Sequence, residues 1–145
     1  MPVWGSRYGL WPVAYVALTC LCVYRLTQDE RLLAWAAAAG RHYLREPFPR
    51  EVPVPAMDAG LAAGLLADLH DLTGEPQWLE GGLGLAQTLA EVYWGDDAPL
   101  PRGAAGIDWY ESQMGPSFLL HGLARLALLA RDGAACPLAP DYTAR

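Results

Sequence analysis

A short turn between two long apolar stretches constrains this chain more than any other feature. The stretch before it, from about Ala56 to Leu72, carries alanine, leucine and glycine in a helical pattern, and Thr73-Gly74-Glu75-Pro76 follows directly. Gly74 suits the position after a helix, where a left-handed backbone is common. Pro76 suits the first turn of the next helix, where its missing N–H is harmless. The sequence therefore predicts a helical hairpin whose second helix runs from about Pro76 to Trp94.

The same reading places three more helices in the chain. They run from about Leu10 to Leu26, from Glu30 to about Glu46, and from about Pro116 to Asp132. Four prolines between residues 47 and 55 prevent regular structure there, and no alternating run in the sequence is long enough for a strand. We therefore predict an all-α fold in a single helical-hairpin domain. Its expected parts are hairpins at about 10–46 and 56–95, a loop at 95–115, a half hairpin at 116–132 and an irregular tail at 133–145.

The two hairpins repeat each other along the chain. Leu26-Thr27 is matched by Leu72-Thr73, and Leu33 by Leu79, in each case 46 residues later. A third copy begins at Gly122 and continues only through its first helix. Self-similarity at such a spacing is typical of repeat architectures, so we expect two and a half stacked hairpins.

The second hairpin, GLLADLHDLTGEPQWLEGGLGLAQTLAEVYW, resembles the repeating unit of the α/α toroids, the six-hairpin glycosidase-like proteins. It keeps Leu72, Thr73, Gly74, Pro76, Trp78, Leu79 and Glu80, and it has Glu75 where these repeats often have Asp. The resemblance implies a ring of hairpins with its site at the mouth formed by the long connections. Toroid families include glycosidases, polysaccharide lyases, sugar epimerases and cyclases, so the resemblance carries a fold and not one reaction.

A complete toroid has about twice as many helices as this sequence predicts. Half a toroid exposes the apolar flanks of its end hairpins, and a repeat array without polar caps needs a neighbour. Hydrophobic residues make up 53% of the chain, which also favours a surface covered by another protein. We therefore expect a partner chain, and a different subunit in preference to a second copy. A five-helix bundle that closes on itself is the alternative.

The loop from Gly95 to Gly115 holds more polar chemistry than a connection needs. Loops of this length are usually functional or disordered, and the aromatic residues argue against disorder. Trp109 and Tyr110 lie between Asp108 and Glu111. Their rings can exclude water and raise a carboxyl pKa toward the range of general acid–base catalysis. We therefore expect catalytic carboxylates in this loop.

Hairpin geometry brings this loop, the N-terminal arm and the proline-rich link to one end of the bundle, together with Asp58. The expected catalytic residues are Asp58, Asp108 and Glu111, and the expected substrate contacts are Arg102, Trp109, Tyr110, Gln113 and His121. Arg102 has the forked guanidinium that grips a carboxylate or sulfate. Plain alternatives exist: Asp58 complements the dipole of its helix, Arg102 is a surface residue, and His121 is a structural histidine.

Composition excludes several other functions. The net charge is −6 without a basic run, so we expect no nucleic-acid binding. All ten basic residues are arginines, which removes Schiff-base chemistry and a phosphate-binding P-loop. Three cysteines and three histidines show no ligand spacing, and the apolar run 11–26 is too short to cross a bilayer. We expect a cytoplasmic protein without a metal, a cofactor or a membrane partner.

Two classes of function remain. The first is an enzyme subunit that acts on a small polar substrate, since paired carboxylates serve elimination, ring closure and glycosidic cleavage. The chain looks like a small subunit of the two-subunit, aziridine-forming enzymes of azinomycin-type pathways, in which an amine displaces a sulfate ester. That likeness implies a base for the amine proton and an arginine-lined sulfate pocket. A glycan-processing hydrolase or lyase subunit is an alternative. The second class is a non-catalytic scaffold or binding subunit of a partner enzyme.

Overall fold

The computed structural model describes residues 3–4, 12–95, 99–107, 115–133 and 136–139. Within these ranges the chain forms α1 (Val13–Thr27), α2 (Glu30–Arg45), α3 (Ala56–Thr73), α4 (Pro76–Tyr93) and α5 (Pro116–Asp132). The same residues form no strand, and Pro55 and Ala104 make an isolated antiparallel bridge. The all-α prediction is confirmed, and each helix boundary lies within three residues of the predicted one.

Local chemistry explains where the helices begin and end. Pro12 precedes α1, and Gln28 ends it in a left-handed conformation with φ 58°. Gly74 ends α3 in the same way with φ 68°, as the sequence predicts. Asp29 caps α2 by accepting a hydrogen bond from the Arg31 N–H. The Arg31 side chain binds the same carboxylate and lowers the pKa of Asp29 to about 2.

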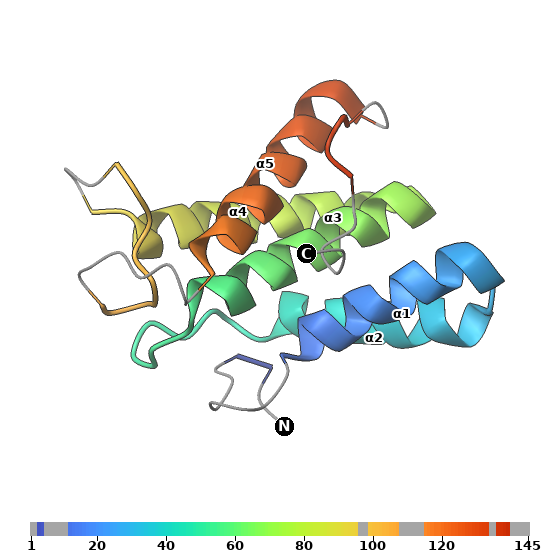
Figure 1. The fold of residues 1–145 in the computed structure, drawn as a ribbon, viewed down its shortest axis with the longest axis horizontal. Helices are drawn as coiled ribbons and strands as arrows, with labels where there is room; N and C mark the ends of the chain where they lie inside the picture. Colours follow the sequence, from blue (N-terminus) through green and yellow to red (C-terminus); the bar gives the residue numbers. More distant parts are fainter. Residues whose placement is uncertain (1–2, 5–11, 96–98, 108–114, 134–135, 140–145) are drawn as a thin grey trace.

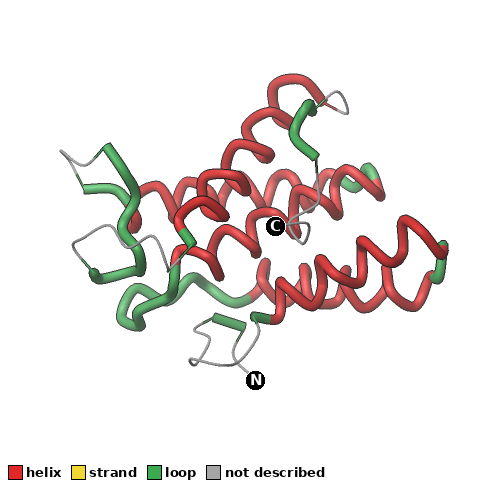
Figure 2. Tube along the Cα trace, viewed as in Figure 1, coloured by secondary structure: helices red, strands yellow, loops and turns green. Residues whose placement is uncertain are grey.

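The helices pack in two layers, with α1, α3 and α5 in one and α2 and α4 in the other, and α3 lies at the centre. In Figure 1, α1 lies in front of α2 and α5 lies in front of α4, while α1 and α5 lie on opposite sides of α3. The central helix touches all four others and is buried without a break from Asp58 to Leu69. Figure 2 shows the two short turns at the right of the view and the long connections at the left, where they form one end of the bundle.

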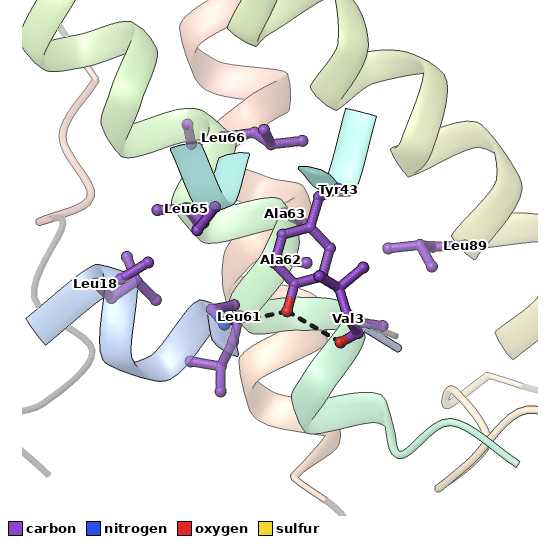
Figure 3. Close-up of a cluster of buried hydrophobic side chains, with 14 of the residues drawn as sticks. Val3, Leu18, Tyr43, Leu61, Ala62, Ala63, Leu65, Leu66 and Leu89 are labelled. Carbon is purple, nitrogen blue, oxygen red and sulfur yellow. Dashed lines mark hydrogen bonds between the residues drawn. The ribbon is translucent and has the colours of Figure 1, made fainter. Parts of the chain in front are cut away.

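Leucines and alanines from all five helices fill the core. Figure 3 shows part of it, with Leu18 of α1 and Leu89 of α4 on either side of Leu61, Leu65 and Leu66 of α3. The crossing of α3 and α5 is very close, since a side chain at Gly60 would collide with the backbone of Phe118 and Leu119. Glycine is therefore required where these two helices meet.

The structure bears on the membrane and cysteine expectations only in part. Across the described residues, no helix combines the length and the apolar character that crossing a bilayer requires. The three cysteines, Cys20, Cys22 and Cys136, form no disulfide.

Candidate functional site

The described parts of the long connections lie together at one end of the bundle. The Ala56 N–H donates to the Gly103 carbonyl over 2.8 Å, and the Ala105 N–H donates to the Val54 carbonyl over 2.9 Å. These bonds join residues 99–107 to the link between α2 and α3. Hairpin geometry predicts such a gathering, and we call this region the connection end.

Aromatic side chains from distant parts of the sequence pack together at the connection end. The ring centroid of Trp4 lies 4.8 Å from that of Tyr43 and 4.9 Å from that of Phe48, both edge-on. Phe48 in turn meets Tyr93, with 6.1 Å between the centroids. The Trp4 indole N–H donates to the Glu46 carbonyl over 3.2 Å. The N-terminal segment, the link and the end of α4 therefore share one apolar cluster.

Two buried tyrosine hydroxyls lie within this cluster. Tyr43 accepts a hydrogen bond from the Ala14 N–H over 3.1 Å and donates to the Val3 carbonyl over 3.3 Å (Figure 3). Tyr93 donates to the Val54 carbonyl over 2.7 Å. Burial raises the pKa of both hydroxyls, and the charge of Asp58 raises both further. Both phenols therefore stay protonated and act as donors.

Asp58 lies in the first turn of α3 and is only 2% exposed. Its negative charge raises the pKa of Tyr43 and of Tyr93, so the carboxylate acts electrostatically on both hydroxyls. The amino end of a helix favours a negative charge, which suits a carboxylate at this position.

Two open grooves on the surface bear on whether a substrate can reach Asp58. One open groove of about 260 Å³ is lined by Val3, Val13, Trp35, Ala38, Ala39 and His42. A second, of about 240 Å³, runs between α2 and α4 and is lined by Tyr43, Leu44, Glu46, Pro47, Phe48, Gly81, Gly84, Leu85 and Thr88. Asp58 lines neither groove. The carboxylate is therefore buried, and neither of these two grooves reaches it.

The other predicted site residues divide into two groups. Asp108, Trp109, Tyr110, Glu111 and Gln113 lie outside the described residues. Arg102 lies inside them and is half-buried, with its guanidinium donating to the Val92 carbonyl over 3.3 Å and its backbone N–H to the Tyr93 carbonyl over 2.7 Å. These contacts satisfy carbonyls at the end of α4, which is a structural task.

His121 is half-buried on α5, four residues before Arg125. Along the helix, His121 lies between the connection end and a group of charged residues that was not predicted from the sequence. We call this group the charge cluster, and its members are Arg25, Asp68, Asp71 and Arg125.

The charge cluster joins the three helices of one layer. The Arg125 guanidinium of α5 binds the Asp68 carboxylate of α3, and both side chains are 1% exposed. Arg25 of α1 lies 3.3 Å from an Asp71 oxygen and 3.8 Å from an Asp68 oxygen. Arg125 also lies 3.7 Å from Asp71. Asp68 therefore has a guanidinium from a neighbouring helix on either side.

Burial raises the pKa of Asp68 to about 6, against the lowering effect of Arg125 and Arg25. Structural ion pairs perturb pKa values as active sites do, and the contacts of Asp68 are of the structural kind. The sequence did hold a signal, because Asp68 interrupts the apolar run GLLADL and Arg125 interrupts GLARLAL. Ionisable groups inside such runs are rarely buried unless paired.

Two further observations bound the site. Within the part of the chain that the structure describes, no three His, Cys, Asp or Glu side chains come together as metal ligands would. Comparison with protein families, with curated proteins and with solved structures found no match to this chain. The function must therefore be inferred from the arrangement of the described residues.

Proposed function

We propose that the protein is one subunit of an enzyme built from helical hairpins, and that a different chain completes both the hairpin array and the active site. The apolar outer faces of α1 and α5 carry this proposal. These helices lie on opposite sides of α3 (Figure 1), where a longer array would continue. A repeat array that ends without polar caps needs a neighbour.

The outer face of α1 is the clearer of the two. Val16 and Val23 are 41% and 40% exposed, and Leu26 at the end of the helix is 86% exposed. Arg25 is the one charged residue in α1, and it is held by Asp71. On α5, Leu120 is 45% exposed. Uncharged, largely apolar faces of this kind fit a neighbouring helix better than they fit water.

The proposed chemistry centres on the connection end. Asp58 would act as acid or base, with Asp108 and Glu111 from the segment between α4 and α5 as its counterparts. Arg102 would hold the anionic group of a small polar substrate. Elimination or ring closure with loss of a sulfate fits such a set, because it needs a base and a guanidinium. Docking of the partner would form the mouth through which the substrate reaches Asp58.

A non-catalytic scaffold is the second candidate, and the burial of Asp58 favours it. That carboxylate is 2% exposed and lines neither groove. A buried acid at a helix amino end also stabilises the helix. As a scaffold, the protein would hold a partner enzyme through the same outer faces of α1 and α5.

Complementation of a host strain that lacks the gene separates the two candidates. The strain would receive the wild type or one of three variants, Asp58→Asn, Asp108→Asn and Glu111→Gln, and its small molecules would be profiled by mass spectrometry. An enzyme subunit predicts that the wild type removes an accumulated precursor while the Asp58→Asn and Glu111→Gln variants do not. Each variant should still co-purify with the partner.

Asp132→Asn is the matched control, because Asp132 is an exposed carboxylate at the end of α5. It should complement like the wild type. If all three site variants also complement fully, the enzyme proposal fails. If the double variant Val16→Glu/Val23→Glu fails while every carboxylate variant works, the scaffold takes its place.

A further inference from the structure

We call the layer formed by α2 and α4 the outer layer. The exposed side of α2 carries positive charge, and that of α4 carries negative charge. Arg31, Arg41 and Arg45 are exposed on α2, and Trp35 beside them is 46% exposed. Arg31 and Trp35 are four residues apart, as are Arg41 and Arg45, and all four fall within about a third of the helix circumference. They therefore form one basic stripe with an aromatic flank. The chain as a whole is acidic, with a net charge of −6, which makes a basic stripe on it notable.

The matching face of α4 is acidic. Glu80, Gln87 and Glu91 are exposed along one side of the helix, and Leu83 beside them is 39% exposed. The two stripes therefore have the same form, a polar row with a large apolar side chain at its flank, and differ in the sign of the charge. Opposite charges in similar rows are the pattern expected of complementary surfaces.

The levels of the charges along the helices also agree. Arg45 and Glu91 are 46 residues apart, which is the spacing that relates the two hairpins. Glu80 lies three residues, less than one helical turn, from the position that the same spacing assigns to Arg31. Each row lies on the side of its helix opposite the buried residues, which include Gly40 and Tyr43 in α2 and Gly82 and Leu89 in α4. Because both helices pack on α3 and touch each other, the two rows face away from α3, with the open groove of about 240 Å³ between the helices.

We propose that this outer layer binds a second copy of the chain in a two-fold dimer, with α2 of each copy lying on α4 of the other. A two-fold axis running along the helices makes both contacts at once, so the assembly closes as a dimer. Pairing α2 with α2 would bring the arginine rows together, and like charges disfavour that arrangement. The dimer uses neither outer face that the proposed function assigns to a different chain.

Two existing ion pairs are compatible with this contact. Arg31 holds Asp29, and Arg50 holds Glu91, but in each pair at least one side chain is well exposed. Exposed pairs of this kind contribute little and are screened by salt, so Arg31 and Glu91 can exchange partners on docking. Trp35 would then pack near Leu83 of the other copy, at the flank of each charged row.

Charge reversal and mixing test the proposal directly. One variant carries Arg31→Glu, Arg41→Glu and Arg45→Glu, and a second carries Glu80→Arg and Glu91→Arg. Light scattering after gel filtration at low salt should give the wild type about twice the monomer mass of 15.7 kDa. Each variant should bind itself with a dissociation constant at least about tenfold higher. An equimolar mixture of the two should recover the dimer, because both contacts then join opposite charges.

Controls separate this result from misfolding and from other partners. Glu51→Arg reverses an exposed charge on the link and should leave the dimer unchanged, and circular dichroism should show the same helix content throughout. A wild type that stays monomeric at roughly 50 µM would overturn the proposal, as would reversed variants that dimerise like the wild type. A monomer that binds a different protein through Trp35 would overturn it too, while leaving the proposed function standing.

Discussion

The central helix buries a carboxylate near each of its ends, and the two are held in different ways. Asp68 lies between the guanidinium groups of Arg125 and Arg25. Asp58 lies in the first turn of the helix, and its charge raises the pKa of Tyr43 and of Tyr93. Asp68 is paired with charged groups from two other helices, whereas Asp58 lies where the dipole of its own helix favours a negative charge. Equal burial therefore does not mean an equal role.

The packing around the two carboxylates differs as well. At the charge cluster, side chains bring α1, α3 and α5 together. Toward the connection end, the backbones of α3 and α5 come close together at Gly60. The aromatic rings of the connection end pack against one another. The first region should respond to the loss of a charge, and the second to added volume or a lost hydroxyl.

The largest effect is expected from Asp68→Leu. This change removes the buried carboxylate that binds the Arg125 guanidinium, which cannot lose its proton and keeps only the partly exposed Asp71 at 3.7 Å as an acidic neighbour. It should lower the free energy of unfolding by about 3–5 kcal/mol. Urea denaturation followed by circular dichroism measures it. The double variant Asp68→Leu/Arg125→Met should recover much of the loss, because no buried charge remains. A single variant as stable as the wild type would remove the distinction between the two carboxylates.

The pH dependence of stability is the next test. The pKa of Asp68 is raised from an ordinary 3.8 to about 6, so its contribution to stability is fully present below pH 4. That contribution is lost as the pH rises through about 6, and the total amounts to about 3 kcal/mol. Denaturation of the wild type and Asp68→Asn at several pH values isolates it. The stability advantage of the wild type should shrink between pH 4 and pH 7, and a constant or growing advantage would contradict the account.

Added volume at the close crossing should cost somewhat less. Gly60→Ala places a methyl group against the backbone of α5 and should destabilise the fold by about 1–3 kcal/mol. Gly84→Ala is the matched control, because a side chain there meets nothing within 4 Å. That control should be neutral or stabilising by up to about 1 kcal/mol. Thermal denaturation of both variants is sufficient, and equal melting temperatures would mean that the crossing is not tight.

The smallest effect is expected from a lost hydroxyl. Tyr93→Phe removes one of the two hydrogen bonds that the buried Val54 carbonyl accepts, while the Ala105 N–H keeps the other, so the loss should cost about 1 kcal/mol. Tyr24→Phe removes an exposed hydroxyl that bonds Glu30 and should change stability very little. Equal losses in the two variants, measured by urea denaturation, would show that the buried hydroxyl carries no special weight.

The helices could be predicted from the sequence because their limits are local. Gly74 and Pro76 fix one turn, and the prolines from residue 47 to residue 55 separate the hairpins by backbone chemistry alone. The gathering of the connections follows from the alternation of helix directions. None of these inferences needs to know which side chains meet across the core.

The charge cluster could not be predicted in the same way. Asp68 and Arg125 are 57 residues apart, and their pairing depends on how α5 crosses α3. The crossing depends in turn on Gly60, whose role is visible only once both helices are placed. The position of Asp58 in the first turn of a helix could be predicted locally, but its burial could not, because burial depends on how the other helices and connections pack around α3.

The most direct test of the account is the mass of the assembly that the protein forms in its own host. A tagged wild-type chain and the double variant Val16→Glu/Val23→Glu would be purified at low salt and measured by light scattering, with mass spectrometry of the subunits. We predict that the wild type elutes with a second helical protein and that the variant has lost it. A wild type that elutes with no other chain, whether at its monomer mass of 15.7 kDa or at about twice that mass, would contradict the account.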